Sequence, residues 1–398
     1  MTAAVITGAG AVSAFGVGLP ALFDGLAAGR SAIGPIRSFD AGAFPVRVAG
    51  EVPITPEGRD RKLAFAVLAA SEAFRGAECT DAERNATLSI ALGLEQAFLE
   101  DFGAVFGEGG IDWAADASAD LPEVRYRSPV DAAARAVRSR LGLTGPAVVH
   151  ASACAGGALA VAHAASLIER GAAEVVLCGA ADSMVNPLGV GGLARLGAPS
   201  PRNEPDACRP FDRRRDGLVI GEGAAMFVVE SEQRARARGV RILARVLGWG
   251  STQDGHRATA PRPDGAAARR AMERALRRAR LEPRDVGYVN AHGTGTPLND
   301  PAEALAISGA LRGLRVPVSS IKGAVGHLMS ASGAIELAAC LLAFERDLLP
   351  GTAHHRERDP DCDVAVIGER PVGVRVNVVL SNSFGFGGQN ACVALGRP

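Results

Sequence analysis

Short apolar, β-branched runs alternate with longer helical runs along most of the 398-residue chain. This alternation is typical of an α/β fold built on a parallel sheet, because helices connect the strands and cover the faces of the sheet. The expected strands are Ala3–Thr7, Leu88–Leu92, Ala147–Ala151, Glu174–Cys178, Ala225–Val229, Ile242–Trp249, Val286–Asn290, Val316–Ser319, Arg375–Ser381 and Ala391–Ala394. The expected helices include Arg61–Arg75, Ser128–Arg140, Cys154–Glu169, Ala266–Ala279, Pro301–Leu311 and Ser332–Phe344.

The second five strands follow a charged helix at Ser231–Gly239, so the chain divides naturally near residue 240. We expect two domains, residues 1–240 and residues 241–398, each with its own series of strands and helices. The segment Glu95–Arg127 has no clear periodicity and is interpreted as an excursion from the sheet. Such excursions often carry binding surfaces or cover a pocket.

Composition excludes several classes of function. The net charge is zero, which argues against a broad nucleic-acid or membrane surface, and no apolar run is long enough to span a bilayer. Seven widely spaced cysteines without a CxxC motif predict neither a disulfide framework nor a metal site. The first residues do not resemble a signal peptide, so we expect a cytoplasmic protein. Among 43 basic residues only Lys62 and Lys322 are lysines, which makes each a candidate for a role that arginine cannot fill.

The stretch "TGAGAVSAFG" after the first strand is reminiscent of a dinucleotide-binding loop. However, Ser13 replaces the third glycine of the motif, and no acidic residue follows a second strand at the required distance. A tight turn from strand to helix is the preferred interpretation.

Cys154 lies between a β-branched run and a helical run of small residues, in "VVHASACAGGALAVAHAASL". This places its sulfur at a helix N-terminus, where the helix dipole favours a thiolate. The small neighbours allow a carbonyl group to approach and leave backbone N–H groups free to stabilise an oxyanion. A buried structural cysteine is the alternative.

Two histidines follow predicted strands in glycine-rich turns. His292 lies in "YVNAHGTGTPLND" and His327 in "SSIKGAVGHLMSASGAIE", which also contains Lys322 and Glu336. Ligands of α/β sheets bind at the carboxyl ends of strands, so Cys154 and both histidines could meet there. A further loop, "SNSFGFGGQNACV", could form a mobile aromatic gate around Phe386 or a plain glycine-rich hairpin.

These four stretches, in this order, resemble the β-ketoacyl-ACP synthases of the elongating type, which are condensing enzymes of the thiolase superfamily. The resemblance extends over nearly the whole chain and includes "RPFDRRRDGLVIGEGAAMFVVE". It implies a thiolase-like α/β fold of two similar halves in a five-layered α/β/α/β/α arrangement. It also implies an acyltransferase, a 3-oxoacyl-ACP synthase of fatty-acid or type II polyketide or polyene biosynthesis.

The resemblance implies a role for each matching residue. Cys154 would accept an acyl chain, and His292 and His327 would stabilise the enolate formed when malonyl-ACP loses CO2. The backbone N–H groups of Cys154 and Phe386 would form the oxyanion hole, and Phe386 would also be the gate. The supporting pair would be Lys322 and Glu336, and the residues that contact the phosphopantetheine arm would be Thr294 and Thr296.

The same resemblance implies partners. The substrates would arrive on the phosphopantetheine of acyl carrier protein, with no other bound cofactor and no metal. The enzyme would be a homodimer, or a heterodimer with a ketosynthase-like partner subunit. Because a carrier protein is acidic, Arg61, Lys62 and Arg202 are candidates for its docking patch, with Arg59 nearby.

The sequence departs from the family pattern at several positions. Leu328 and Met329 replace small or hydroxyl residues, and Gln389 replaces a common threonine, which makes a polyketide ketosynthase a serious possibility. Two other functions stay open. A cysteine hydrolase or acyltransferase would use Cys154 with one histidine as base. A non-catalytic partner subunit would typically lack the nucleophile that this chain retains. A thiolase proper is disfavoured, because Cys392 lies inside a predicted strand.

Overall fold

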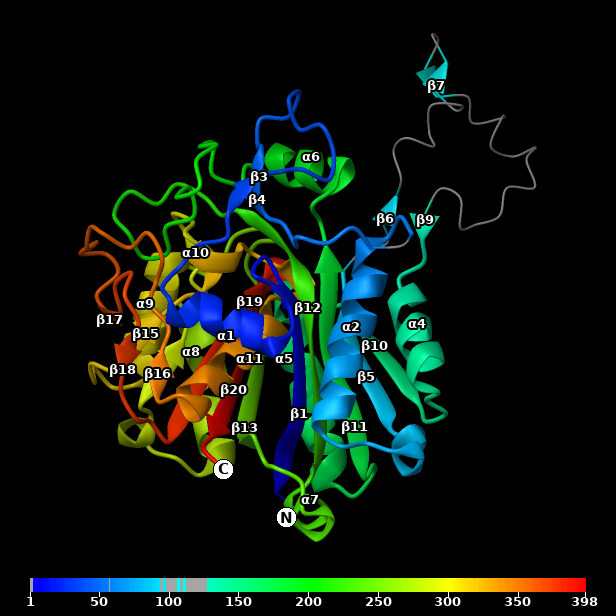
Figure 1. Cartoon of the computed structure of the whole chain (residues 1–398). Helices are drawn as coiled ribbons and strands as arrows, with labels where there is room; N and C mark the ends of the chain where they lie inside the picture. The colour runs from blue at the N-terminus through cyan, green and yellow to red at the C-terminus, as the bar shows by residue number, and fades with distance from the viewer. Residues whose placement is uncertain (1–2, 57, 94–95, 98–105, 108–109, 112–126) are drawn as a thin grey trace.

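The computed structural model describes residues 3–56, 58–93, 96–97, 106–107, 110–111 and 127–398 (Figure 1). The predicted excursion at residues 95–127 therefore lies largely outside the described residues. Its described parts are four two-residue strands: β6 (Gln96–Ala97), β7 (Phe106–Gly107), β8 (Gly110–Ile111) and β9 (Arg127–Ser128). All ten strands expected from the sequence are present, although their bounds differ.

The first half of the chain forms one part of a large mixed sheet. Its strands are β1 (Ala4–Ser13), β5 (Thr87–Leu92), β10 (Ala147–His150), β11 (Val175–Ser183) and β12 (Ile220–Ser231). They lie in the order β10-β5-β11-β12-β1. β10, β5 and β11 run parallel to one another, and β12 is antiparallel to its neighbours β11 and β1.

The second half repeats this arrangement. Its strands are β13 (Ala244–Gln253), β14 (Tyr288–Asn290), β15 (Pro317–Ser319), β19 (Val378–Gly385) and β20 (Gln389–Gly396). Their order is β15-β14-β19-β20-β13, with the same parallel and antiparallel pairs, and β1 pairs with β13 to join the halves. Both halves therefore have the strand order third, second, fourth, fifth, first. The repeat supports a division near residue 240, which remains our interpretation.

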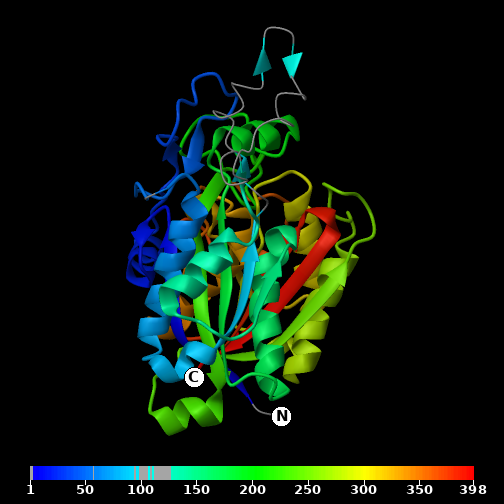
Figure 2. The same cartoon turned by 90° about the vertical axis from the view of Figure 1, so that its right-hand side faces the viewer.

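Helices cover both faces of the two half-sheets and fill the space between them. The central helices are α5 (Gly156–Glu169) and α11 (Ser332–Glu345), which contact strands of both halves. The outer helices are α2 (Arg61–Gly76), α4 (Ala132–Leu141), α8 (Ala266–Ala279) and α9 (Asn299–Ala310). Figures 1 and 2 show α2 and α4 on one side of the molecule and α8 and α9 on the other, with α5 and α11 between. This is the expected five-layered arrangement.

Several shorter elements complete the fold. The helices are α1 (Leu19–Ala27), α6 (Pro187–Arg195), α7 (Glu232–Arg238) and α10 (Lys322–Val325). The strands are β2 (Gly16–Val17), β3 (Gly34–Pro35), β4 (Val48–Gly50), β16 (Leu348–Leu349), β17 (Ala365–Val366) and β18 (Val372–Gly373). Of these helices only α7 was predicted, from its run of charged residues. Among the helices of the described residues, none is long and apolar enough to cross a membrane.

The prediction of a tight turn after the first strand is wrong. β1 continues through "TGAGAVS" to Ser13, and its glycines serve packing rather than turning. A Cβ atom on Gly8 or Gly10 would lie 2.1 Å from a backbone carbonyl oxygen of α2. In β13, a Cβ atom on Gly248 or Gly250 would lie 2.5 Å or 2.0 Å from a carbonyl oxygen of α8. In each half, glycine thus lets the outer helix pack directly on the strand backbone.

We predict that Gly10→Ala lowers the free energy of unfolding by about 1–3 kcal/mol, the usual range for a methyl group forced into a packed interior. Urea unfolding followed by circular dichroism measures this change. Gly34→Ala is the matched control in a strand, because an added Cβ there meets nothing within 4 Å. Equal stability of the two variants would contradict the packing role of Gly10.

Candidate active site

Cys154 lies in a short 3-10 turn, Ala153–Ala155, between β10 and the start of α5. Ala153 has a φ angle of 44°, in the left-handed region that non-glycine residues seldom adopt. Strained backbone of this kind is common at functional sites. Cys154 is buried, with 6% of its surface exposed. The predicted turn from strand to helix at the nucleophile is therefore present.

The beginnings of α5 and α11 lie against each other. A Cβ atom on Gly157 would lie 2.4 Å from the backbone nitrogen of Ala334, and one on Gly333 would lie 2.7 Å from the nitrogen of Ala158. Larger side chains at either glycine would push the helices apart. The small residues that follow Cys154 are therefore required to bring it close to the turn before α11, which contains His327.

His292 follows β14 and is held by the carboxylate of Glu303 on α9. The Glu303 side chain accepts hydrogen bonds from the backbone N–H groups of His292 (2.8 Å) and Gly293 (2.7 Å). Burial raises the pKa of Glu303 to about 7. Asp300 supports the same turn by accepting from the N–H groups of Thr294 (3.1 Å) and Gly295 (3.2 Å). The sequence analysis missed both carboxylates, although their spacing on one helix turn facing the HGTGT segment was a usable signal.

Lys322 connects His292 to Glu336. Its ammonium group lies 3.3 Å from Nδ1 of His292 and 2.5 Å from the His292 carbonyl oxygen, and it pairs with Oε1 of Glu336. Three acceptors therefore match the three N–H bonds of an ammonium group. Because an ammonium group only donates, Nδ1 of His292 is an acceptor and Nε2 holds the proton. The predicted supporting pair is thus in contact with a site histidine.

His327 lies in the turn between α10 and α11 and adopts the same tautomer. The backbone N–H of Met329 donates to its Nδ1 at 3.1 Å, and Oγ of Ser332 lies 2.8 Å from the same atom. Nε2 of His327 therefore also holds its proton. The rings of His292 and His327 lie edge to face, with centroids 5.3 Å apart.

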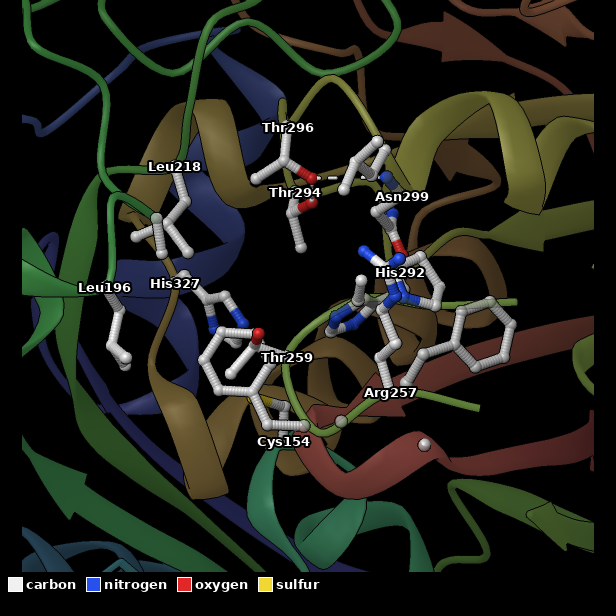
Figure 3. Close-up of a pocket in the computed structure, with 18 of the residues that line it drawn as sticks. Cys154, Leu196, Leu218, Arg257, Thr259, His292, Thr294, Thr296, Asn299 and His327 are labelled. Carbon is white, nitrogen blue, oxygen red and sulfur yellow. Dashed lines mark hydrogen bonds between the residues drawn. The ribbon is translucent and has the colours of Figure 1, made fainter. Parts of the chain in front are cut away.

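One cavity of about 460 Å³ joins these groups. Figure 3 shows Cys154, His292 and His327 around it, with Thr294 and Thr296 further along the wall. The hydroxyl groups of the two threonines lie 2.8 Å apart, as expected for neighbours on one wall. The structure thus places together the nucleophile, both histidines and both threonines that the sequence singled out.

Burial dominates the electrostatics of the cavity. Burial and then the charge of Lys322 hold the pKa of His292 and that of His327 well below 6.5, so both imidazoles are neutral. Burial also raises the pKa of the Cys154 thiol to about 12, although Lys322 and the Phe386 N–H lower it. Burial therefore opposes the thiolate that the helix N-terminus favours.

The glycine-rich loop between β19 and β20 forms one wall of the cavity. Gly385 passes so close to Cys154 that an added Cβ would lie 3.0 Å from the Cys154 nitrogen. Phe384 is buried with its ring 5.7 Å from that of His292, whereas Phe386 is 36% exposed. Positive φ angles of 81° at Gly387 and 78° at Gly388 follow Phe386. This geometry fits a gate at Phe386 better than a plain hairpin that buries both rings.

The predicted docking patch is not a surface patch in this structure. Lys62 is 1% exposed and pairs with Asp60 at 3.1 Å. Arg61 contacts the buried carboxylate of Glu222 through Nε and Nη2 and the carbonyl oxygens of two residues before α2. Because both side chains neutralise internal groups, their placement argues against a docking role. Arg202 is half-exposed and pairs with Asp216, which lines the cavity.

We predict that Lys322→Met lowers the free energy of unfolding by about 3–5 kcal/mol, because it leaves a buried carboxylate without its partner. The double variant Lys322→Met, Glu336→Leu should recover most of this loss, since it removes both charges together. Urea unfolding of the single and double variants measures the coupling. Additive losses would contradict a tightly coupled buried pair.

The raised pKa of Cys154 predicts how the free enzyme reacts with iodoacetamide. Below the pKa the thiolate fraction grows about tenfold for each pH unit, so the alkylation rate should rise from pH 7 to pH 9 without a plateau. Intact-protein mass spectrometry follows the reaction, and Cys154→Ala gives the background from the other six cysteines. A plateau below pH 8 would show that the helix end and Lys322 outweigh burial.

Comparison with known proteins gives one consistent result. The model of the β-ketoacyl synthase N-terminal domain matches residues 1–235, and that of the C-terminal domain matches residues 243–356. The tetracenomycin polyketide synthase ketoacyl synthase alpha subunit of Streptomyces glaucescens is 37% identical, covering 99% of this chain and 97% of that protein. The 3-oxoacyl-[acyl-carrier-protein] synthase 2 of Synechocystis is 36% identical, covering 98% and 97%.

Solved structures agree. A type II polyketide ketosynthase in complex with its acyl carrier protein matches with a TM-score of 0.89 and 27% identity over the whole of both chains. The ishigamide ketosynthase/chain length factor matches with a TM-score of 0.87 and 32% identity, covering 100% of this chain and 99% of that one. The chain therefore belongs to the β-ketoacyl synthase family of condensing enzymes with a thiolase-like fold.

Proposed function

We propose that this condensing enzyme holds an acyl chain on Cys154 and joins it to the carbanion formed from malonyl-ACP, with His292 and His327 as oxyanion donors. The observation that supports this assignment is the pair of neutral imidazoles that share one cavity with the cysteine, each with its proton on Nε2. Neutral N–H donors in a buried site stabilise a developing oxyanion strongly.

The first half-reaction transfers the acyl chain. The Cys154 sulfur attacks the thioester carbonyl of acyl-ACP, and the negative charge that forms on oxygen meets the backbone N–H groups of Cys154 and Phe386. The carbon–sulfur bond to the pantetheine then breaks. The thiol proton of Cys154 ends on the departing pantetheine sulfur, so acylation consumes no external base.

The second half-reaction forms the new carbon–carbon bond. The bond between the malonyl α-carbon and its carboxylate breaks, CO2 leaves, and the electron pair forms an enolate. Nε2–H of His292 and Nε2–H of His327 donate to the enolate oxygen. The α-carbon then attacks the acyl carbonyl on Cys154, and the sulfur leaves as a thiolate. A proton from water restores the thiol, and 3-oxoacyl-ACP is released.

The same tautomers argue against a cysteine hydrolase. A hydrolase of this kind needs an imidazole nitrogen with a free lone pair directed at the thiol or at water. Here Nδ1 of each histidine accepts hydrogen bonds from Lys322 or from Met329, and each Nε2 holds a proton. Both histidines are therefore arranged as donors.

Acyl carrier protein is the proposed partner, with substrates held on its phosphopantetheine and no other cofactor in the reaction. Thr294 and Thr296 would contact the arm, and Arg202, which pairs with the cavity residue Asp216, would contact the carrier. The relatives include both polyketide and fatty-acid enzymes, so we propose either pathway, as a homodimer or with a ketosynthase-like partner subunit. The seven cysteines are all unpaired, which supports a reducing compartment, and we propose the cytoplasm.

Intact-protein mass spectrometry tests the function directly. Purified enzyme is mixed with a panel of acyl-ACPs and then with malonyl-ACP. We expect an acyl adduct on the wild type but not on Cys154→Ala, followed by release of 3-oxoacyl-ACP. We expect His292→Ala and His327→Ala to form the adduct yet lose condensation by about 100-fold or more each, as for other oxyanion donors.

Two results would contradict the proposal. A histidine variant that condenses malonyl-ACP at the wild-type rate would exclude that histidine as an oxyanion donor. An adduct on the wild type that releases free acid instead of 3-oxoacyl-ACP, in the presence of a ketosynthase-like partner subunit, would favour a hydrolase.

A further inference from the structure

The environment of His327 differs from that of His292. Nδ1 of His292 faces the ammonium group of Lys322, whereas Nδ1 of His327 faces two neutral donors, the Met329 N–H and the Ser332 hydroxyl. Ser332 is the first residue of α11 and is 1% exposed. The sequence analysis assigned it no role.

The direction of the Ser332 hydrogen bond follows from that of Met329. A backbone N–H only donates, so it meets the lone pair of Nδ1 and not an N–H bond. The Ser332 oxygen at 2.8 Å would then repel that lone pair unless its own proton points to Nδ1. The hydroxyl is therefore a donor, and it orients the ring within its plane from the side of α11.

We propose that Ser332 is a positioning residue, whose hydroxyl holds the imidazole of His327 so that Nε2–H is aimed at the enolate oxygen. The inference rests on the proposed role of His327. The positioning role follows from the geometry, because the other donor, Met329, gives the His327 ring only one hydrogen bond. The backbone of Met329 is itself strained, with a φ angle of 46°. Two donors from different parts of the turn are needed to fix both the position and the rotation of a ring.

The charged and titratable groups near His327 do not make the hydrogen bond that the Ser332 hydroxyl makes to its ring. The charged groups around the site include Lys322, its partner Glu336, and Asp182, which accepts from the backbone N–H of Ser330 at 2.9 Å. Asp216, Asp254 and Arg257 line the same cavity. The titratable neighbours across the cavity are His292 and Cys154. Among the described residues, none of these charged or titratable groups donates a hydrogen bond to Nδ1 of His327, so the backbone N–H of Met329 is the other donor that the structure shows.

Ser330 provides a matched control two residues away. It lies in the same turn, is 3% exposed, and its hydroxyl has no hydrogen-bond partner among the residues that the structure describes. Ser330→Ala removes a buried hydroxyl oxygen, like Ser332→Ala. Unlike Ser332→Ala, it breaks no hydrogen bond that the structure shows. A difference between the two alanine variants therefore reports the contact with His327 and not the loss of a buried hydroxyl.

The test measures malonyl-ACP decarboxylation and condensation by the acylated enzyme. Ser332→Ala should lower kcat about tenfold, equivalent to roughly 1.4 kcal/mol, with KM for malonyl-ACP and the rate of self-acylation unchanged. Ser330→Ala should match the wild type, and Ser332→Thr, which retains the hydroxyl, should recover most of the rate. In ¹⁵N-histidine-labelled enzyme, the Nδ1 resonance of His327 should shift in Ser332→Ala but not in Ser330→Ala.

His327→Ala is the reference that separates the two proposals, and it also assigns the His327 resonance. If His327→Ala retains the wild-type rate, the role of His327 itself is wrong. If His327→Ala is impaired while Ser332→Ala and Ser330→Ala are equally active, only the positioning role is overturned. Parallel losses of self-acylation, thermal stability and condensation in Ser332→Ala would likewise overturn it, because they indicate a general structural defect.

Discussion

The close contact between α5 and α11 is the constraint on which the site depends. Each helix begins next to a reacting group, α5 after Cys154 and α11 after the turn of His327. Gly157 and Gly333 allow backbone atoms of the two helices to touch where the helices cross. The two half-sheets enclose this helix pair, so neither helix can move outward without breaking a packed layer. The distance between nucleophile and histidine is therefore set by core packing, and the chemistry needs no flexible loop to assemble it.

Burial gives this site its electrostatic character. It keeps both imidazoles and the thiol uncharged, while one ammonium group, that of Lys322, satisfies three acceptors at once. Arginine could not replace it, because a planar fork cannot meet three acceptors arranged around one point. The two lysines of an arginine-rich chain are both buried beside carboxylates, Lys322 with Glu336 and Lys62 with Asp60. The structure thus gives both lysines an internal role, although the sequence had suggested a docking role for Lys62.

The sequence predicted local features better than contacts between residues distant in the chain. Strands and helices with a clear period were placed well, and α8 was predicted with its exact bounds. Cys154, His292 and His327 were found because each follows a strand in a turn of small residues. The predicted turn after β1 was wrong, and the structure argues against a docking role for Arg61, for one reason. Both depend on contacts with residues distant in sequence, the α2 backbone and Glu222. Ser332 was missed because a single hydrogen bond to a histidine leaves no local pattern, whereas Glu303 could have been found from its spacing with Asp300 on one helix turn.

The repeated topology explains how one backbone design supports two different roles. Ala153 and Met329 each open a 3-10 turn with a left-handed φ angle, 44° and 46°, and each turn leads into a 14-residue central helix. Cys154 is the second residue of the first turn, and Ser330 has the same position in the second. The repeat therefore contains two equivalent positions, of which the first is occupied by a cysteine, Cys154, and the second by a serine, Ser330. The other turn instead contacts His327, whose ring receives the N–H of Met329 and lies 2.8 Å from the hydroxyl of Ser332, so the same backbone design holds a thiol in one half and an imidazole in the other.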